Sequence, residues 1–115
     1  MPITVRVDTS KIAPSIRKAS SNALAILTQQ VVKDSNMYVP VDTGNLRNSS
    51  LRASDFSNGK AIWDTKYAMR LYYGVSFHFS HDVNPLAQAM WFDKAASVHS
   101  NEWADVAQRA VEKGL

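Results

Sequence analysis

The sequence predicts an α+β protein, with a long N-terminal helix and a C-terminal helix packed on a small, mostly antiparallel sheet. Three observations lead to this fold class. Apolar residues alternate with polar ones near the N-terminus, as in a half-buried strand. They recur at three- and four-residue spacing in two long stretches, as on the buried face of a helix. Between these stretches, Asn58-Gly59 is the dipeptide most typical of a two-residue hairpin turn.

The composition is typical of one folded domain. The chain has 115 residues, of which 45% are hydrophobic and 20% charged, so it is long enough for one modest core. We therefore assign residues 1–115 to a single domain. The absence of cysteine excludes disulfides and thiolate chemistry, and it fits assembly in a reducing cytoplasm. No secretory signal and no apolar run of about 18 residues is present, so we expect a soluble chain.

The first two elements follow from residue spacing. Ile3, Val5 and Val7 alternate with polar residues and predict a short strand over residues 2–7. A helix of about seven turns is then predicted from Lys11 to residue 37 or 38, because Pro40 disfavours helical dihedrals in the residue before it. Its apolar face comprises Ile12, Ile16, Ala19, Ala23, Ile26, Leu27 and Val31, and its polar face Arg17, Lys18, Ser21, Thr28 and Lys33.

Residues 40–51, which we call the elbow, join this helix to the middle of the chain. Pro40 ends the helix, and the Asp42 carboxylate is expected to accept hydrogen bonds from the N–H groups of residues 44 or 45. Gly44 supplies backbone freedom, and the side chains of Leu46 and Leu51 are expected to hold the elbow against the core. The residues that we assign to this structural corner are Pro40, Asp42, Thr43, Gly44, Leu46 and Arg47.

The second half of the chain is predicted as a hairpin followed by helices. Residues 50–56 and 61–66 are expected to pair through a type I′ turn at Asn58-Gly59, in which both residues need a positive φ. A short helix over residues 67–74 ends at Gly74, and residues 75–84 are predicted to form a loop or a loop that contains a short strand. A last helix begins at Leu86 and runs to Gly114, with Asn101 as a possible cap or kink. Its first apolar face comprises Ala87, Met90, Trp91, Ala95 and Val98.

Chemical motifs favour a protein without catalytic activity. His78, His81 and Asp82 offer metal-ligand atoms, but they fall in the least regular segment, where a third ligand and a fixed geometry are missing. We therefore predict no metal site there and no cofactor. The chain lacks the Gly-x-Ser-x-Gly motif of serine hydrolases, a phosphate-binding glycine loop and a paired-carboxylate motif. We predict that the protein is not an enzyme.

The helix length and the aromatic residues predict an assembly. A first helix of about 27 residues would be about 40 Å long, whereas a compact domain of this size has a radius of gyration near about 13 Å. Its free end would therefore extend beyond the domain. The apolar residues of that end would be covered by a neighbouring subunit. Trp63, Trp91 and Trp103 are expected mainly in the core, although aromatic side chains also anchor interfaces. The predicted interface residues are Ile12, Ile16, Trp63, Tyr67 and Trp91.

Four segments resemble a known family. Residues 38–49, Tyr-Val-Pro-Val-Asp-Thr-Gly-Asn-Leu-Arg-Asn-Ser, resemble the Pro-x-Asp-Thr-Gly-x-Leu-Arg-x-Ser signature of small head-tail connector, or tail-completion, proteins of long-tailed bacteriophages, also called minor capsid proteins. Residues 63–68, 71–74 and 89–95 resemble later blocks of that family in the same order. The resemblance covers residues 12–113. Many relatives carry an acidic residue shortly before the glycine at position 74, where this chain has Leu71-Tyr72-Tyr73.

The resemblance implies a structural protein of the virion. Such a protein is expected in the phage neck, as a subunit of a homo-oligomeric ring that joins the head connector to the tail and contacts neighbouring neck and tail proteins. Genomic DNA would pass through the ring without sequence recognition. The alternative is a small DNA-binding accessory domain that uses scattered cations, for which the net charge of +3 is a weak signal. The cations concerned are Arg47, Arg52, Lys60 and Lys66.

Overall fold

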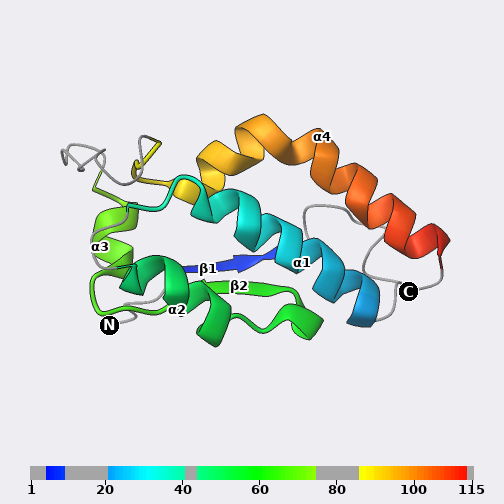
Figure 1. The fold of residues 1–115 in the computed structure, drawn as a ribbon, viewed down its shortest axis with the longest axis horizontal. Helices are drawn as coiled ribbons and strands as arrows, with labels where there is room; N and C mark the ends of the chain where they lie inside the picture. The colour runs from blue at the N-terminus through cyan, green and yellow to red at the C-terminus, as the bar shows by residue number, and fades with distance from the viewer. Residues whose placement is uncertain (1–4, 10–20, 41–43, 75–85, 114–115) are drawn as a thin grey trace.

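The computed structural model describes residues 5–9, 21–40, 44–74 and 86–113 (Figure 1). Within them, four helices and a short 3-10 turn surround a two-stranded antiparallel sheet, which confirms the α+β class. The elements in chain order are β1 (Val5–Asp8), α1 (Ser21–Asn36), α2 (Asn45–Ala53), the 3-10 turn η3 (Phe56–Asn58), β2 (Lys60–Trp63), α3 (Ala68–Tyr72) and α4 (Trp91–Glu112). None of the helices in these ranges is long and apolar enough to cross a membrane.

Helix α1 is the central element of the fold. It lies between α4 on one side and the sheet with α2 on the other (Figure 1). Because both sides are covered, its buried residues form more than one stripe. Ala23, Leu27 and Val31 are fully buried as predicted, but Thr28 is also fully buried, so its assignment to a polar face was wrong. Conversely, Ile26 was predicted in the core and is 37% exposed.

The N-terminal part of the predicted long helix lies outside the described residues. The described helix has 16 residues, which corresponds to about 24 Å at 1.5 Å per residue. Ile12 and Ile16, and with them the expected overhang, therefore stay predictions. The C-terminal end agrees with the expectation, since α1 ends at Asn36, four residues before Pro40.

The sheet pairs distant strands. Of the predicted hairpin, the structure contains β2 and an isolated antiparallel bridge between Asp55 and Lys60, but no first strand. Strand β2 runs antiparallel to β1, with Val5 opposite Trp63 and Asp8 opposite Lys60. Most of the predicted strand over residues 50–56 is the end of α2 and the start of η3. Gly59 has the positive φ of 73°, whereas Asn58 is not among the described residues with positive φ, so the turn is not type I′. Gly59 instead ends η3 and directs β2 toward β1.

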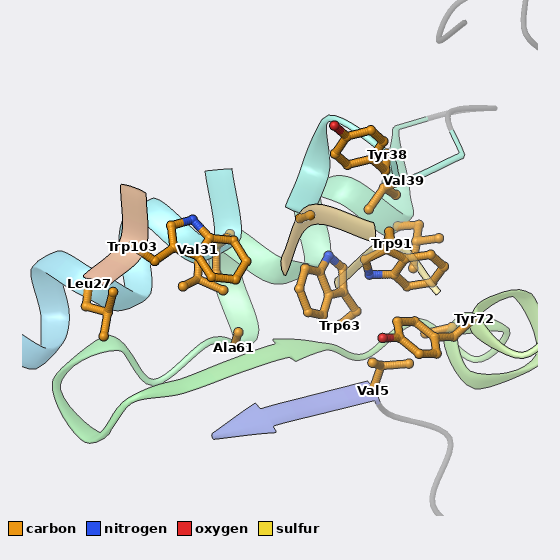
Figure 2. Close-up of a cluster of buried hydrophobic side chains, with 14 of the residues drawn as sticks. Val5, Leu27, Val31, Tyr38, Val39, Ala61, Trp63, Tyr72, Trp91 and Trp103 are labelled. Carbon is orange, nitrogen blue, oxygen red and sulfur yellow. The ribbon is translucent and has the colours of Figure 1, made fainter. Parts of the chain in front are cut away.

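The three tryptophans form the core, as the sequence predicted. Trp63, Trp91 and Trp103 have no exposed surface. Figure 2 shows the Trp63 and Trp91 rings side by side, and their centroids are 5.9 Å apart in an edge-to-face arrangement. The end of α1 supplies two hydrogen-bond acceptors: Asn36 Oδ1 lies 2.9 Å from Trp63 Nε1, and Asp34 Oδ2 lies 2.7 Å from Trp103 Nε1. Polar residues of α1 are therefore structural parts of the core.

Helices α3 and α4 complete the fold. Helix α3 confirms the predicted short helix within residues 67–74. Helix α4 is continuous through Asn101, so Asn101 does not cap it. It begins at Trp91 rather than Leu86, because Met90 adopts a left-handed conformation with a φ of 50°. Ala95 is buried as predicted, but Val98 is 51% exposed and Met90 37% exposed, which corrects the predicted apolar face.

Candidate assembly interface

Helix α2 lies between two hollows on the surface of the molecule. The first, which we call the α1–α2 groove, has a volume of about 370 Å³ and lies between α1, α2 and η3. Its walls are mainly apolar, and two wall residues are strongly exposed: Leu51 at 62% and Met37 at 45%. The other apolar wall residues are Val32 and Phe56. Large apolar side chains gathered in one exposed hollow are typical of a surface that a partner covers.

Two cations flank the apolar wall of the groove. Lys33 is exposed on α1, and Arg47 is half-buried on α2. Arg47 Nε donates a hydrogen bond of 3.1 Å to the carbonyl oxygen of Asn36, which fixes the side chain beside the end of α1. Within the described part of the chain, neither cation is paired with an acidic group. The groove therefore suits an apolar surface that carries acidic residues.

The second hollow, which we call the Tyr67 cleft, lies on the other flank of α2. Its volume is about 570 Å³, and its lining includes Arg52, Lys66 and Tyr67. Arg52 forms a two-pronged ion pair with Asp64, in which Arg52 Nη1 lies 2.9 Å from Asp64 Oδ2. Hydrogen bonding to Arg52 lowers the pKa of the Asp64 carboxyl and raises the pKa of Arg52. The pair holds the end of α2 against the segment that follows β2.

The residues of the predicted elbow fall into three groups. Asp42 and Thr43 lie outside the described residues. Leu46 is buried in the core as predicted, but Leu51 is exposed in the α1–α2 groove, so its role as a core anchor was wrong. Gly44 takes the left-handed conformation, with a φ of 84°, directly before α2 begins, and its carbonyl accepts a hydrogen bond from Asn48 N. The elbow is thus the start of a helix rather than the start of a strand.

Asp42 is expected to stabilise this helix start. The first turn of α2 contains no acidic residue, and Gly44 makes no side-chain capping bond. An acceptor from the preceding residues would satisfy free N–H groups there. Asp42→Ala should lower the free energy of unfolding by about 1 kcal/mol, measured by urea denaturation. Unfolding curves that coincide with those of the wild type would exclude the capping role.

The predicted interface residues also fall into groups. Tyr67 is 41% exposed and lines the Tyr67 cleft, where a partner has access to it. Trp63 and Trp91 have no exposed surface, so they contact the chain's own core and not a solvent-facing surface. Ile12 and Ile16 lie outside the described residues. The sequence reasoning missed Met37, and the available signal was its large apolar side chain at the end of a helix, next to the elbow.

The structure weakens the DNA-binding alternative. Of the four cations proposed to contact DNA, Arg52 is paired with Asp64, and Lys60 Nζ lies 3.1 Å from Asp8 Oδ2. A cation already paired within the protein gains less from a phosphate. Arg47 lies in the apolar groove and Lys66 in the Tyr67 cleft, on opposite flanks of α2. The four cations therefore do not form one stripe.

Fold and surface together define a class of protein: a small α+β chain with a core built on three tryptophans and an apolar groove on its outer face, as in structural proteins that assemble with partners. The chain belongs to the minor capsid protein family, whose model matches residues 3–111. This makes it a structural protein of the bacteriophage virion. No match was found among curated proteins, and none among solved structures.

Proposed function

We propose that the protein is a subunit of an oligomeric ring in the phage neck, where it joins the head connector to the tail. Membership of the minor capsid protein family supports a place in the virion, and the resemblance to head-tail connector proteins supports the neck. The observation that carries the proposal is the α1–α2 groove, with its exposed Leu51 and Met37 and its two cations that lack acidic partners among the described residues. DNA would pass through the ring without sequence recognition.

The proposed occupant of the groove is α4 of a neighbouring copy. The outer face of α4 carries exposed acidic residues, Asp105 and Glu112, and an exposed apolar residue, Val98. The two carboxylates and Val98 complement the cations and the apolar wall of the groove, although Arg109 is also exposed between the carboxylates on this face. Tyr67, and Ile12 and Ile16 outside the described residues, are further proposed contact residues.

The positions of the two surfaces favour a ring. Helix α4 packs against α1 on the side opposite the groove (Figure 1). A contact between the groove of one copy and α4 of the next therefore joins two different surfaces. Such a head-to-tail contact repeats around an axis and closes into a ring when the rotation per subunit divides a full turn. A two-fold dimer would instead need the same surface on both copies.

The proposal is tested by placing a charge in the groove. Leu51→Asp should abolish assembly and incorporation into particles, because the carboxylate removes the apolar contact and repels the acidic residues of the proposed occupant. Since Leu51 is 62% exposed, the monomer should stay folded. Tyr73→Asp is the matched control, since Tyr73 is 65% exposed but lies outside the groove. The measurements are native mass spectrometry, circular dichroism and particle incorporation.

Charge reversal tests the identity of the occupant. Lys33→Glu should weaken assembly, and Lys33→Glu combined with Asp105→Lys and Glu112→Lys should restore it at least in part. Incorporation of Leu51→Asp at the wild-type level would overturn the groove as an interface. Loss of incorporation without rescue by the reversed charges would assign the groove to another virion protein.

A further inference from the structure

A second cluster of side chains lies on the opposite side of α1 from the groove. It consists of Asp34 at the end of α1 and of His99 and Glu102, one turn apart on α4. One ligand atom from each residue lies within 4.8 Å of the other two. A carboxylate, an imidazole and a second carboxylate are ligands that divalent transition metal ions accept together.

Asp34 is a buried carboxylate with neutral hydrogen-bond donors. Its residue surface is only 6% exposed. It accepts hydrogen bonds from Trp103 Nε1 at 2.7 Å and from Gln30 Nε2 at 3.0 Å. No lysine or arginine in the described ranges pairs with it. A buried negative charge held by neutral donors alone is costly, and a cation beside it would lower that cost.

His99 presents a buried nitrogen that is not satisfied. Its side chain is 15% exposed, and its Nδ1 lies 3.0 Å from Glu102 Oε2. When Nδ1–H donates to Glu102, Nε2 carries a lone pair, and this buried atom has no hydrogen-bond partner among the described residues. The Trp103 ring stacks near the imidazole, with centroids 6.5 Å apart and planes 22° apart, which restricts the orientation of the ring. The 3.0 Å between Nδ1 and Glu102 Oε2 is also close to the separation of two ligand atoms that share one ion.

We propose that Asp34, His99 and Glu102 bind a divalent transition metal ion of the zinc class. Metal–ligand bonds of about 2.1 Å separate neighbouring ligand atoms by about 3–4 Å, so small side-chain rotations close the cluster on an ion. The exposed side of Glu102 leaves a fourth position for water. The ion would neutralise Asp34, occupy a nitrogen of His99 and join α1 to α4.

The chain has three histidines, which gives the experiment matched variants. The untagged, chelator-treated protein is titrated with Zn²⁺ by calorimetry, and Co²⁺ absorption reports the ligand set. The wild type and the His78→Ala/His81→Ala double variant should bind one ion and melt at a higher temperature with Zn²⁺ than with chelator. His99→Gln and Glu102→Gln should bind more than about tenfold more weakly, since even outer-sphere partners are typically worth about 10- to 100-fold.

Three outcomes would overturn the proposal. The first is the absence of stoichiometric binding by the folded wild type. The second is binding that survives His99→Gln and is lost in His78→Ala/His81→Ala, which would assign it to the other histidines. The third is binding that is unchanged in both His99→Gln and Glu102→Gln, which would place the ion elsewhere on the chain. Glu102 is exposed at 67% of its side chain, so Glu102→Gln keeps the test valid if His99→Gln fails to fold.

Discussion

Trp63→Ala is expected to lower the free energy of unfolding by about 3–5 kcal/mol, the usual cost of removing a large aromatic side chain from a core. Trp63 has no exposed surface, lies edge-to-face with Trp91 and donates a hydrogen bond to Asn36 Oδ1. The substitution therefore leaves a cavity and an unpaired acceptor at the end of α1. Urea denaturation followed by circular dichroism measures the loss without relying on tryptophan fluorescence.

Phenylalanine variants separate the cavity from the hydrogen bond. Trp91 is as fully buried as Trp63, but its Nε1 has no hydrogen-bond partner among the described residues. Trp91→Phe therefore removes a similar volume without breaking a bond, whereas Trp63→Phe leaves Asn36 Oδ1 unpaired. Trp63→Phe should be more destabilising by about 1–3 kcal/mol. Equal losses for the two variants would contradict a structural role for the Asn36 side chain.

Gly59→Ala is the second change with a large expected effect, a loss of about 2–4 kcal/mol, because backbone strain and overpacking act together. Gly59 has a φ of 73°, and a Cβ there would lie 3.0 Å from both Leu24 Cδ1 and Thr9 Oγ1. Thr9 Oγ1 also lies 3.0 Å from the Gly59 carbonyl oxygen and 2.8 Å from Thr28 Oγ1. The added methyl group would therefore disturb the contact between α1 and the start of β2.

Gly44→Ala is the matched control for this experiment. Gly44 also has a positive φ, of 84°, but among the described residues a Cβ there would meet only Asn48 Nδ2, at 3.7 Å. This variant should lose only the backbone term, about 1–2 kcal/mol. Thermal and urea denaturation of both variants measure the difference. If Gly44→Ala were as destabilising as Gly59→Ala, close packing at Gly59 would contribute nothing.

The spacing of apolar residues predicted the helices α1, α3 and α4, but it did not predict which other elements pack against each face of these helices. Thr28 and Asp34 lie on α1 where a one-sided helix would meet solvent, yet both are buried. Their partners are Thr9 and Trp103, 19 and 69 residues away in the chain. A pattern within one helix contains no information about such distant partners, so the second buried side of α1 was missed.

The middle of the chain shows a second limit of sequence reasoning. Residues 45–53 are mostly polar, and their large apolar residues are Leu46 and Leu51. With so few apolar positions, the second half of this stretch fits a strand pattern and a helix pattern about equally. The Ser49 and Ser50 hydroxyls donate to the carbonyls of Leu46 and Arg47, which satisfies their side chains within the helix. Leu46 then faces the core, while Leu51 faces the groove.

The candidate sites were predictable only in part. The elbow signature covers part of α2, around which both hollows lie, but it did not predict that helix. The groove itself depends on contacts between α1, α2 and η3 that spacing does not show. His99 and Glu102 have the separation of neighbours on a helix, a signal that was present in the sequence. Asp34 joins them only because α1 and α4 pack together.

The sheet and the helix packing both connect distant parts of the chain, and this constrains folding during synthesis. Strand β1 pairs with β2, so the sheet cannot form until residue 63 has left the ribosome. Asp34 and the side of α1 around it stay uncovered until Trp103 of α4 has been made. Structures dominated by such distant contacts fold slowly and expose apolar surface while incomplete. A nascent chain that ends before α4 is therefore the species most exposed to aggregation and to chaperone binding.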